Sequence, residues 1–147
     1  MTAHYTSKHG QVSKGPEELF MAFTDMRNFT RLAPPQYKDK VEITADFDNL
    51  TMSVQGMRFG LRVDERQPYR LIRIGSAESP VEFVASLHFD QSPIPGRTDF
   101  WIEAAANLNF MMKTMLGGKI QKALDKAVDT LVDISEGRMP EMPGDIL

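Results

Sequence analysis

Side chains able to do acid–base or metal chemistry are few in this sequence, and their spacing brings none of them together. The three histidines are His4, His9 and His88. His4 and His9 lie five residues apart on the first predicted strand, an odd spacing that puts them on opposite faces. His88 falls on the polar face of a later strand. We therefore expect His88 to be a surface histidine and His4 and His9 to be poor co-ligands, and we expect no metal site and no catalytic residue.

The carboxylates of the predicted strands also point toward water. Asp64, Glu82, Asp90 and Glu103 alternate out of phase with the apolar residues, so none is a candidate for a buried general acid or base. The absence of cysteine excludes disulfides, thiolate metal sites and a cysteine nucleophile. No nucleotide-binding glycine pattern, serine-hydrolase elbow or zinc-protease motif is present. We expect no cofactor.

Composition favours one globular domain over the whole chain, 1–147, with an extended tail at 137–147. The 147 residues are 41% hydrophobic and 25% charged, with a net charge of -3. No basic surplus exists to neutralise phosphates, so nucleic acid is not an expected partner. No apolar run reaches the roughly 20 residues of a membrane span, and the polar N-terminus lacks a signal peptide. The expected location is cytoplasmic.

Alternation of apolar and polar residues predicts an antiparallel sheet with one dry face and one wet face. About seven strands are expected, at 4–12, 41–47, 50–55, 57–63, 70–77, 81–89 and 99–110. Short turn sequences between most of them favour hairpins. The dry face needs a cover, and the sequence must provide it elsewhere.

Helical spacing appears in three places. Pro16 suits a first helical position, and Leu19, Phe20 and Phe23 form the apolar face of a short helix. A second short helix is predicted from Met26 to Leu32. The long segment 111–136 repeats apolar residues every three or four positions. We expect it to form a helix that crosses the whole dry face diagonally. The fold class is therefore α+β, a curved antiparallel sheet on a long C-terminal helix.

This order of elements resembles the START-like, or SRPBCC, superfamily, whose fold is called the helix grip and which includes polyketide cyclases. Four segments carry the resemblance: VSKGPEELF at 12–20, FTDMRNF at 23–29, QPYRLI at 67–72 and GRT at 96–98. The resemblance covers roughly residues 4–136. It implies a cavity between the sheet and the last helix, with an apolar small molecule as the usual guest.

Three functions follow from the resemblance and the residue pattern. The first is binding or carriage of a hydrophobic small molecule. The second is a cyclase-like or aromatase-like enzyme that uses polar groups such as Tyr5, Thr98 or Tyr69. The third is a domain with a filled core that acts through its surface, an alternative kept open by the many bulky residues of the dry face.

Six residues combine dry-face phase with expected proximity to the last helix, and we predict that they line the site: Met52, Phe59, Phe83, Phe100, Met112 and Leu116. The methionines fit either a pocket wall or an ordinary core. Gly117-Gly118 marks either a close approach at the cavity mouth or a late start of the helix. Trp101, on the wet face, is either a partly covered surface residue or a contact for a partner such as a second copy in a homodimer.

Overall fold

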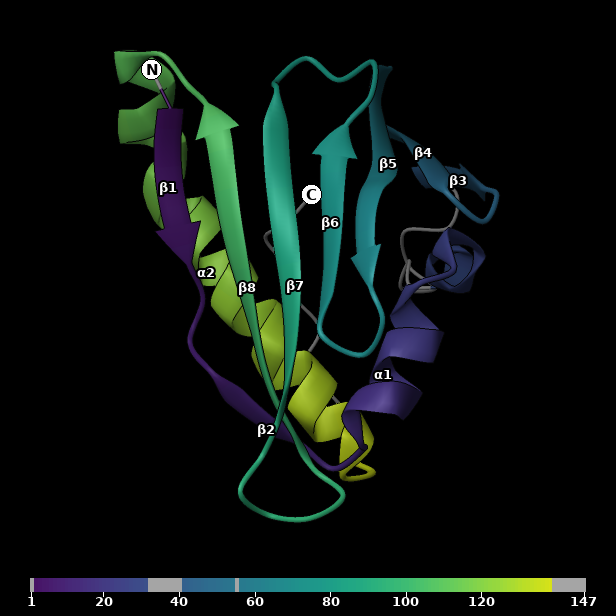
Figure 1. Cartoon of the computed structure of the whole chain (residues 1–147). Helices are drawn as coiled ribbons and strands as arrows, with labels where there is room; N and C mark the ends of the chain where they lie inside the picture. The colour runs from purple at the N-terminus through teal and green to yellow at the C-terminus, as the bar shows by residue number, and fades with distance from the viewer. Residues whose placement is uncertain (1, 32–40, 55, 139–147) are drawn as a thin grey trace.

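An eight-stranded antiparallel sheet curves around two short helices and one long helix (Figure 1). The computed structural model describes residues 2–31, 41–54 and 56–138. The strands are β1 (Thr2–Thr6), β2 (Gly10–Val12), β3 (Val41–Ala45), β4 (Asn49–Val54), β5 (Met57–Gln67), β6 (Leu71–Ser76), β7 (Phe83–Gln91) and β8 (Thr98–Asn107). The helices are α1 (Pro16–Phe23), the 3-10 helix η1 (Met26–Arg31) and α2 (Phe110–Ser135).

Strands β3 to β8 form a meander in which consecutive strands are paired. At the other edge, β1 from the start of the chain pairs with β8. The order is β1-β8-β7-β6-β5-β4-β3, and β2 also pairs with β8. The predicted first strand is therefore two strands, and the predicted count of about seven becomes eight. This topology and the long C-terminal helix confirm the predicted helix-grip fold.

At the break between β1 and β2, side chains of α2 bind the backbone. Gln121 donates a hydrogen bond to the carbonyl oxygen of Thr6, and Asp125 accepts one from the backbone N–H of Lys8. The break also shifts the side-chain phase. His4 pairs with Ala105, and His9 stacks on Trp101, which lies on the same convex face as Ala105. Our prediction that the two histidines lie on opposite faces was wrong for this reason.

Helix α2 begins at Phe110, one residue before the predicted start at Met111, and is continuous through both glycines. The side chain of Asn109 accepts a hydrogen bond from the backbone N–H of Met112, which caps the first turn. The helix contacts β1, β2 and β8, and it runs behind this side of the sheet in Figure 1. Its expected path across the whole dry face was wrong: α1 contacts β6 and β7, and η1 contacts β3 and β4.

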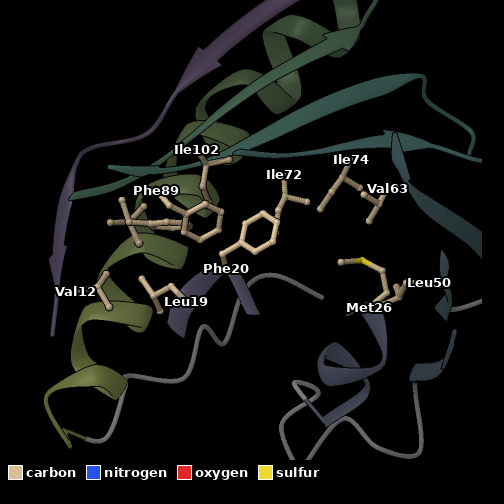
Figure 2. Packing of buried hydrophobic residues seen from close by; sticks show 12 residues of the cluster. Val12, Leu19, Phe20, Met26, Leu50, Val63, Ile72, Ile74, Phe89 and Ile102 are labelled. Carbon is tan, nitrogen blue, oxygen red and sulfur yellow. The ribbon is translucent and has the colours of Figure 1, made fainter. Parts of the chain in front are cut away.

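The core lies where these helices meet the concave face of the sheet (Figure 2). Val12, Leu19, Phe20, Ile72 and Phe89 are among its buried side chains, and Val128 of α2 is fully buried against them. Thr98, at the start of β8, is also fully buried and donates a hydrogen bond to the carbonyl oxygen of Lys14. The start of α1 is thereby fixed to the sheet.

Candidate functional site

The concave face divides into a filled part and a partly open part. In the filled part, the rings of Phe20, Phe23, Phe89 and Phe100 lie 5.4 to 6.1 Å apart between centroids. Phe29 stacks on Phe23, and Figure 2 shows Phe20 and Phe89 pointing toward each other from α1 and β7. These rings fill the space between α1 and the sheet, which leaves no room for a ligand among them.

The partly open part lies farther along β7 and β8, toward the start of α2. Phe83 and Ala85 on β7 face the same side as their partners Ala106 and Ala104 on β8. All four are only half-buried, although they share the concave phase of the buried Phe89 and Phe100. The small alanine side chains of β8 leave part of this surface exposed.

One side of α2 packs on the edge of the sheet formed by β1 and β2. The adjacent side of the helix faces the partly open part of the concave face. Gly117 lies over Tyr5, Gln121 reaches Thr6, and Val128 lies over Gly10. This adjacent flank consists of apolar residues spaced three or four positions apart along α2. Two of them, Leu124 and Leu131, pack against the core cluster. Leu116, Ile120, Leu124 and Leu131 of this flank are all half-buried. An apolar surface on α2 therefore faces an apolar surface on β7 and β8.

The predicted wall residues do not all lie in the open part. Phe100 is 3% exposed and belongs to the packed aromatic cluster. Met52 and Phe59 are opposite each other on β4 and β5, and both are half-buried. Phe83, Met112 and Leu116 are half-buried as well. The five half-buried residues stay candidates for a ligand site, with Phe83, Met112 and Leu116 on the elements that border the partly open space.

Of the two adjacent glycines, Gly117 allows a close approach between α2 and β1. A Cβ atom added at Gly117 would lie 3.2 Å from the hydroxyl oxygen of Tyr5, whereas one at Gly118 would meet nothing within 4 Å. Both residues lie inside α2, so the helix does not start late. Gly117 lets the Tyr5 hydroxyl lie against the helix backbone.

Tyr5 is the polar group that this part of the concave face leaves unpaired. Its hydroxyl oxygen is buried and has no hydrogen-bond partner among the described residues. The other two polar candidates are different: Thr98 donates to Lys14, and Tyr69 is 44% exposed in a turn with its ring edge against Phe20. A buried unpaired hydroxyl is costly, so a guest atom that reached the Tyr5 hydroxyl would gain a hydrogen bond.

An inward arginine escaped the sequence analysis. The register between β5 and β6 shifts between Val63 and Glu65, and this bulge turns Arg66 to the side of Ile72. The Arg66 guanidinium donates to Thr24 and to Asp48, and it lies 4.4 Å from the ring centroid of Phe47. Its donors are used by the protein itself, so Arg66 fastens the α1–η1 junction to the sheet.

The convex face carries a three-ring stack around the single tryptophan. His9 and His88 lie on the two faces of the Trp101 ring, at centroid distances of 4.4 and 4.6 Å. The His9 ring nitrogen Nδ1 lies 3.1 Å from Asp99, and the Trp101 ring N–H donates to Glu103. Both faces of Trp101 are covered within the chain, which favours its reading as a partly covered surface residue.

A hollow of about 530 Å³ also opens at one end of the sheet. Its lining includes Gly75, Val84 and Ala105, neighbours across β6, β7 and β8 on the convex side, and also the paired Phe83 and Ala106 of the concave phase. Asp64, Glu78 and Glu82 stand around it. Within the part of the chain that the structure describes, no three His, Asp or Glu side chains are placed to hold a metal ion. No helix there is long and apolar enough to cross a membrane.

Comparison with solved structures places this arrangement in a known fold. Norcoclaurine synthase from Thalictrum flavum matches with a TM-score of 0.66 at 12% identity, over 91% of this chain and 86% of that one. Protein Mll3558 from Rhizobium loti matches at 0.58 and 17% identity, over 84% and 92%. Protein CV1439 from Chromobacterium violaceum matches at 0.55 and 17%, over 90% and 97%. The sequence itself matches no protein-family model and no curated protein.

These likenesses extend over most of each chain and confirm the fold that the sequence motifs indicated. The chain has the helix-grip fold of START-like, or SRPBCC, proteins. At 12 to 17% identity the likeness concerns the path of the backbone. What the chain does must be argued from its own residues.

Proposed function

We propose that the chain binds an apolar small molecule on the concave face, between the first half of α2 and strands β7 and β8. One observation carries the proposal: apolar side chains that face each other across this space are only half-buried. Leu116 and Ile120 on α2 and Phe83, Ala85 and Ala104 on the strands share this state. A guest would remove their remaining surface from water, which is favourable by about 25 cal/mol per Å².

The chemistry of the walls selects a guest without net charge. The side chains that border the space are aliphatic, aromatic or small, and the polar exception is the Tyr5 hydroxyl. Arg66, the inward charge found on β5, is engaged by Thr24, Asp48 and Phe47. A guest with an apolar body and one oxygen or nitrogen atom near Tyr5 would fit this set. One structural neighbour, norcoclaurine synthase, has been crystallised with dopamine and hydroxybenzaldehyde, two small aromatic molecules.

A pair of neighbouring residues on α2 provides a matched test. Leu116 is on the half-buried flank, whereas Met115 is 66% exposed on the solvent side. We expect a neutral dye such as N-phenylnaphthylamine to bind the native protein with increased fluorescence. Leu116→Trp should abolish the increase because the indole occupies the site, and Met115→Trp should leave it unchanged. Equal binding by both variants, or no binding by the native protein, would refute the proposal and favour the filled-core alternative.

An enzyme acting on an apolar substrate is the second candidate, and the unpaired Tyr5 hydroxyl favours it. A phenol held in an apolar space can donate a proton or a hydrogen bond to a substrate oxygen. The test is to identify guests of the natively purified protein by mass spectrometry and to incubate them with native protein and with Tyr5→Phe. Conversion of a guest by the native protein but not by the Tyr5→Phe variant would support catalysis. Recovery of unchanged guest from both would leave binding as the function.

A further inference from the structure

The start of α2 exposes large apolar side chains to water. Phe110, Met111 and Met115 are 77%, 70% and 66% exposed, the three highest values among the large hydrophobic residues of the described chain. They occupy the first two turns of the helix, beyond the point where Gly117 meets Tyr5. We call these three residues the apolar tip. A cluster of this kind on a protein surface marks a contact with another apolar body.

One lysine lies within the apolar tip and two follow it along α2, in a segment without acidic residues. Residues 104–124 contain Lys113, Lys119 and Lys122 and no Asp or Glu, a local charge of +3 in a chain whose net charge is -3. All three lysines are exposed, and none forms an ion pair with another described residue. A helix end that combines Phe and Met side chains with lysines has the composition of segments that bind anionic lipid surfaces.

We propose that the apolar tip and its three lysines dock the protein on an anionic membrane surface. Phe110, Met111 and Met115 would enter the boundary between headgroups and acyl chains. Lys113, Lys119 and Lys122 would lie at the level of the lipid phosphates. The proposal goes beyond ligand binding, and it stands on exposure and charge, so it does not depend on whether a guest is bound.

Charge argues against a second copy of this chain as the occupant. A two-fold symmetric contact places the same patch on both sides, so two sets of three lysines would meet with no carboxylate in either segment to neutralise them. The repulsion would oppose the apolar contact. An anionic lipid surface satisfies both features at once, because it attracts the lysines and accepts the apolar side chains.

The position of the tip suits contact with a flat surface. In Figure 1, α2 starts at the end of the molecule where β8 ends and β5 begins, opposite the loop that joins β7 to β8. Met57, the first residue of β5, is 50% exposed and is followed by the exposed Arg58. Glu78 and Glu82, between β6 and β7, would be repelled by an anionic surface. We therefore expect a tilted contact led by the start of α2.

Vesicle sedimentation tests the proposal directly. The full chain is mixed with vesicles of phosphatidylcholine alone, or of phosphatidylcholine with phosphatidylserine, and the pelleted fraction is measured. We expect binding to the anionic vesicles that weakens with added salt. Replacing Phe110, Met111 and Met115 together by serine should abolish it. Each Lys→Gln exchange at 113, 119 or 122 should weaken it about fivefold, since a lysine near such a surface contributes roughly 1 kcal/mol.

Matched controls come from the opposite end of the molecule. Ile94 is 53% exposed between β7 and β8, and Lys14 is exposed before α1. Ile94→Ser and Lys14→Gln should bind vesicles like the native protein. In a Trp101→Phe background, Phe110→Trp provides a single reporter at the tip, and its emission should shift to the blue when anionic vesicles are added.

Two results would overturn the docking proposal. The first is equal or absent pelleting with both vesicle types, together with a Phe110→Trp emission that does not shift. The second is sedimentation equilibrium showing a dimer that the tip variants dissociate, which would identify a second copy as the occupant. Dye binding in the Leu116→Trp experiment is independent of both results, so failure of one proposal is distinguishable from failure of the other.

Discussion

Gly10 is the position where the grip between β2 and α2 is closest, and adding one methyl group there should loosen it. A Cβ atom at Gly10 would lie 2.5 Å from Cγ1 of Val128 and 2.8 Å from Cγ2 of Val132. Both are methyl groups of β-branched side chains, which have few alternative rotamers in a helix. Gly10→Ala therefore forces α2 away from β2 or moves the helix side chains off their preferred rotamers.

The net cost of Gly10→Ala is the difference of two effects. Overpacking a tight contact destabilises by about 1–3 kcal/mol. Replacing glycine by alanine at an ordinary backbone conformation returns about 0.4–1 kcal/mol by reducing the entropy of the unfolded chain. We expect a net loss of about 1–2 kcal/mol in the free energy of unfolding. Gly118→Ala, inside α2, where an added Cβ meets nothing within 4 Å, should be stabilising because alanine favours a helix interior over glycine, and it serves as the control.

A double-mutant cycle measured by urea denaturation tests the contact itself. Val128→Ala alone should cost about 2 kcal/mol, because a fully buried side chain loses two methyl groups. In Gly10→Ala/Val128→Ala the new methyl occupies vacated space, so the double variant should be about 1 kcal/mol more stable than the sum of the single effects predicts. Strict additivity would show that β2 and α2 do not touch at Gly10, and the described docking of the helix would be refuted.

Three further predictions concern groups away from the proposed ligand space. Arg66→Met should lower the free energy of unfolding by roughly 2–3 kcal/mol in a denaturant titration, because charge-assisted hydrogen bonds at the α1–η1 junction are lost; an unchanged midpoint would contradict that role. The hydrogen bond from Arg27 lowers the pKa of Asp25, and that from Asn49 lowers the pKa of Asp46. A lowered pKa stabilises the fold above the unfolded aspartate value of about 4 and loses this effect as the pH falls through the folded value, so Asp46→Asn should flatten the acid limb of stability against pH, and an unaltered limb would argue against it. His88→Ala should shift the emission of Trp101 to the red by exposing one face of the indole, whereas no shift would mean that the ring is not covered there.

The sequence predicted the strands and helices whose side-chain pattern is set by burial of one face against the core. The strands β3 to β8 alternate because one face meets the core, and α2 repeats every three to four residues for the same reason. Helix boundaries followed from local chemistry, such as Pro16 at the first position of α1. The start of α2 was predicted to within one residue, but its cap Asn109 was assigned to the preceding strand. These features depend on neighbours in the chain, and neighbours in the chain are what a sequence displays.

Features that depend on contacts between distant segments were not predictable. At the interruption between β1 and β2, the backbone forms hydrogen bonds with Gln121 and Asp125, more than a hundred residues away. Without it, His4 and His9 would lie on opposite faces, as the unbroken alternation indicated. The path of α2 likewise follows from two bare backbone positions, Gly10 and Gly117, where strand and helix come together.

The extent of free space on the concave face depends on both kinds of information, which is why the six predicted wall residues separated into two groups. Alternation predicted that Phe83 and Phe100 share one face of the sheet, and both lie on the concave face. It could not show that α1 delivers Phe20 and Phe23 against Phe100 while Phe83 faces only alanines across β8. The bulge after Val63 has a related effect, since it carries Arg66 to the concave side and fastens α1 over the same region. The short helices thus fill one part of the concave face, and the small side chains of β8 leave surface accessible in the other. Because α2 borders the accessible part and also carries the apolar tip, the two proposals assign a guest and a membrane to the same half of this helix.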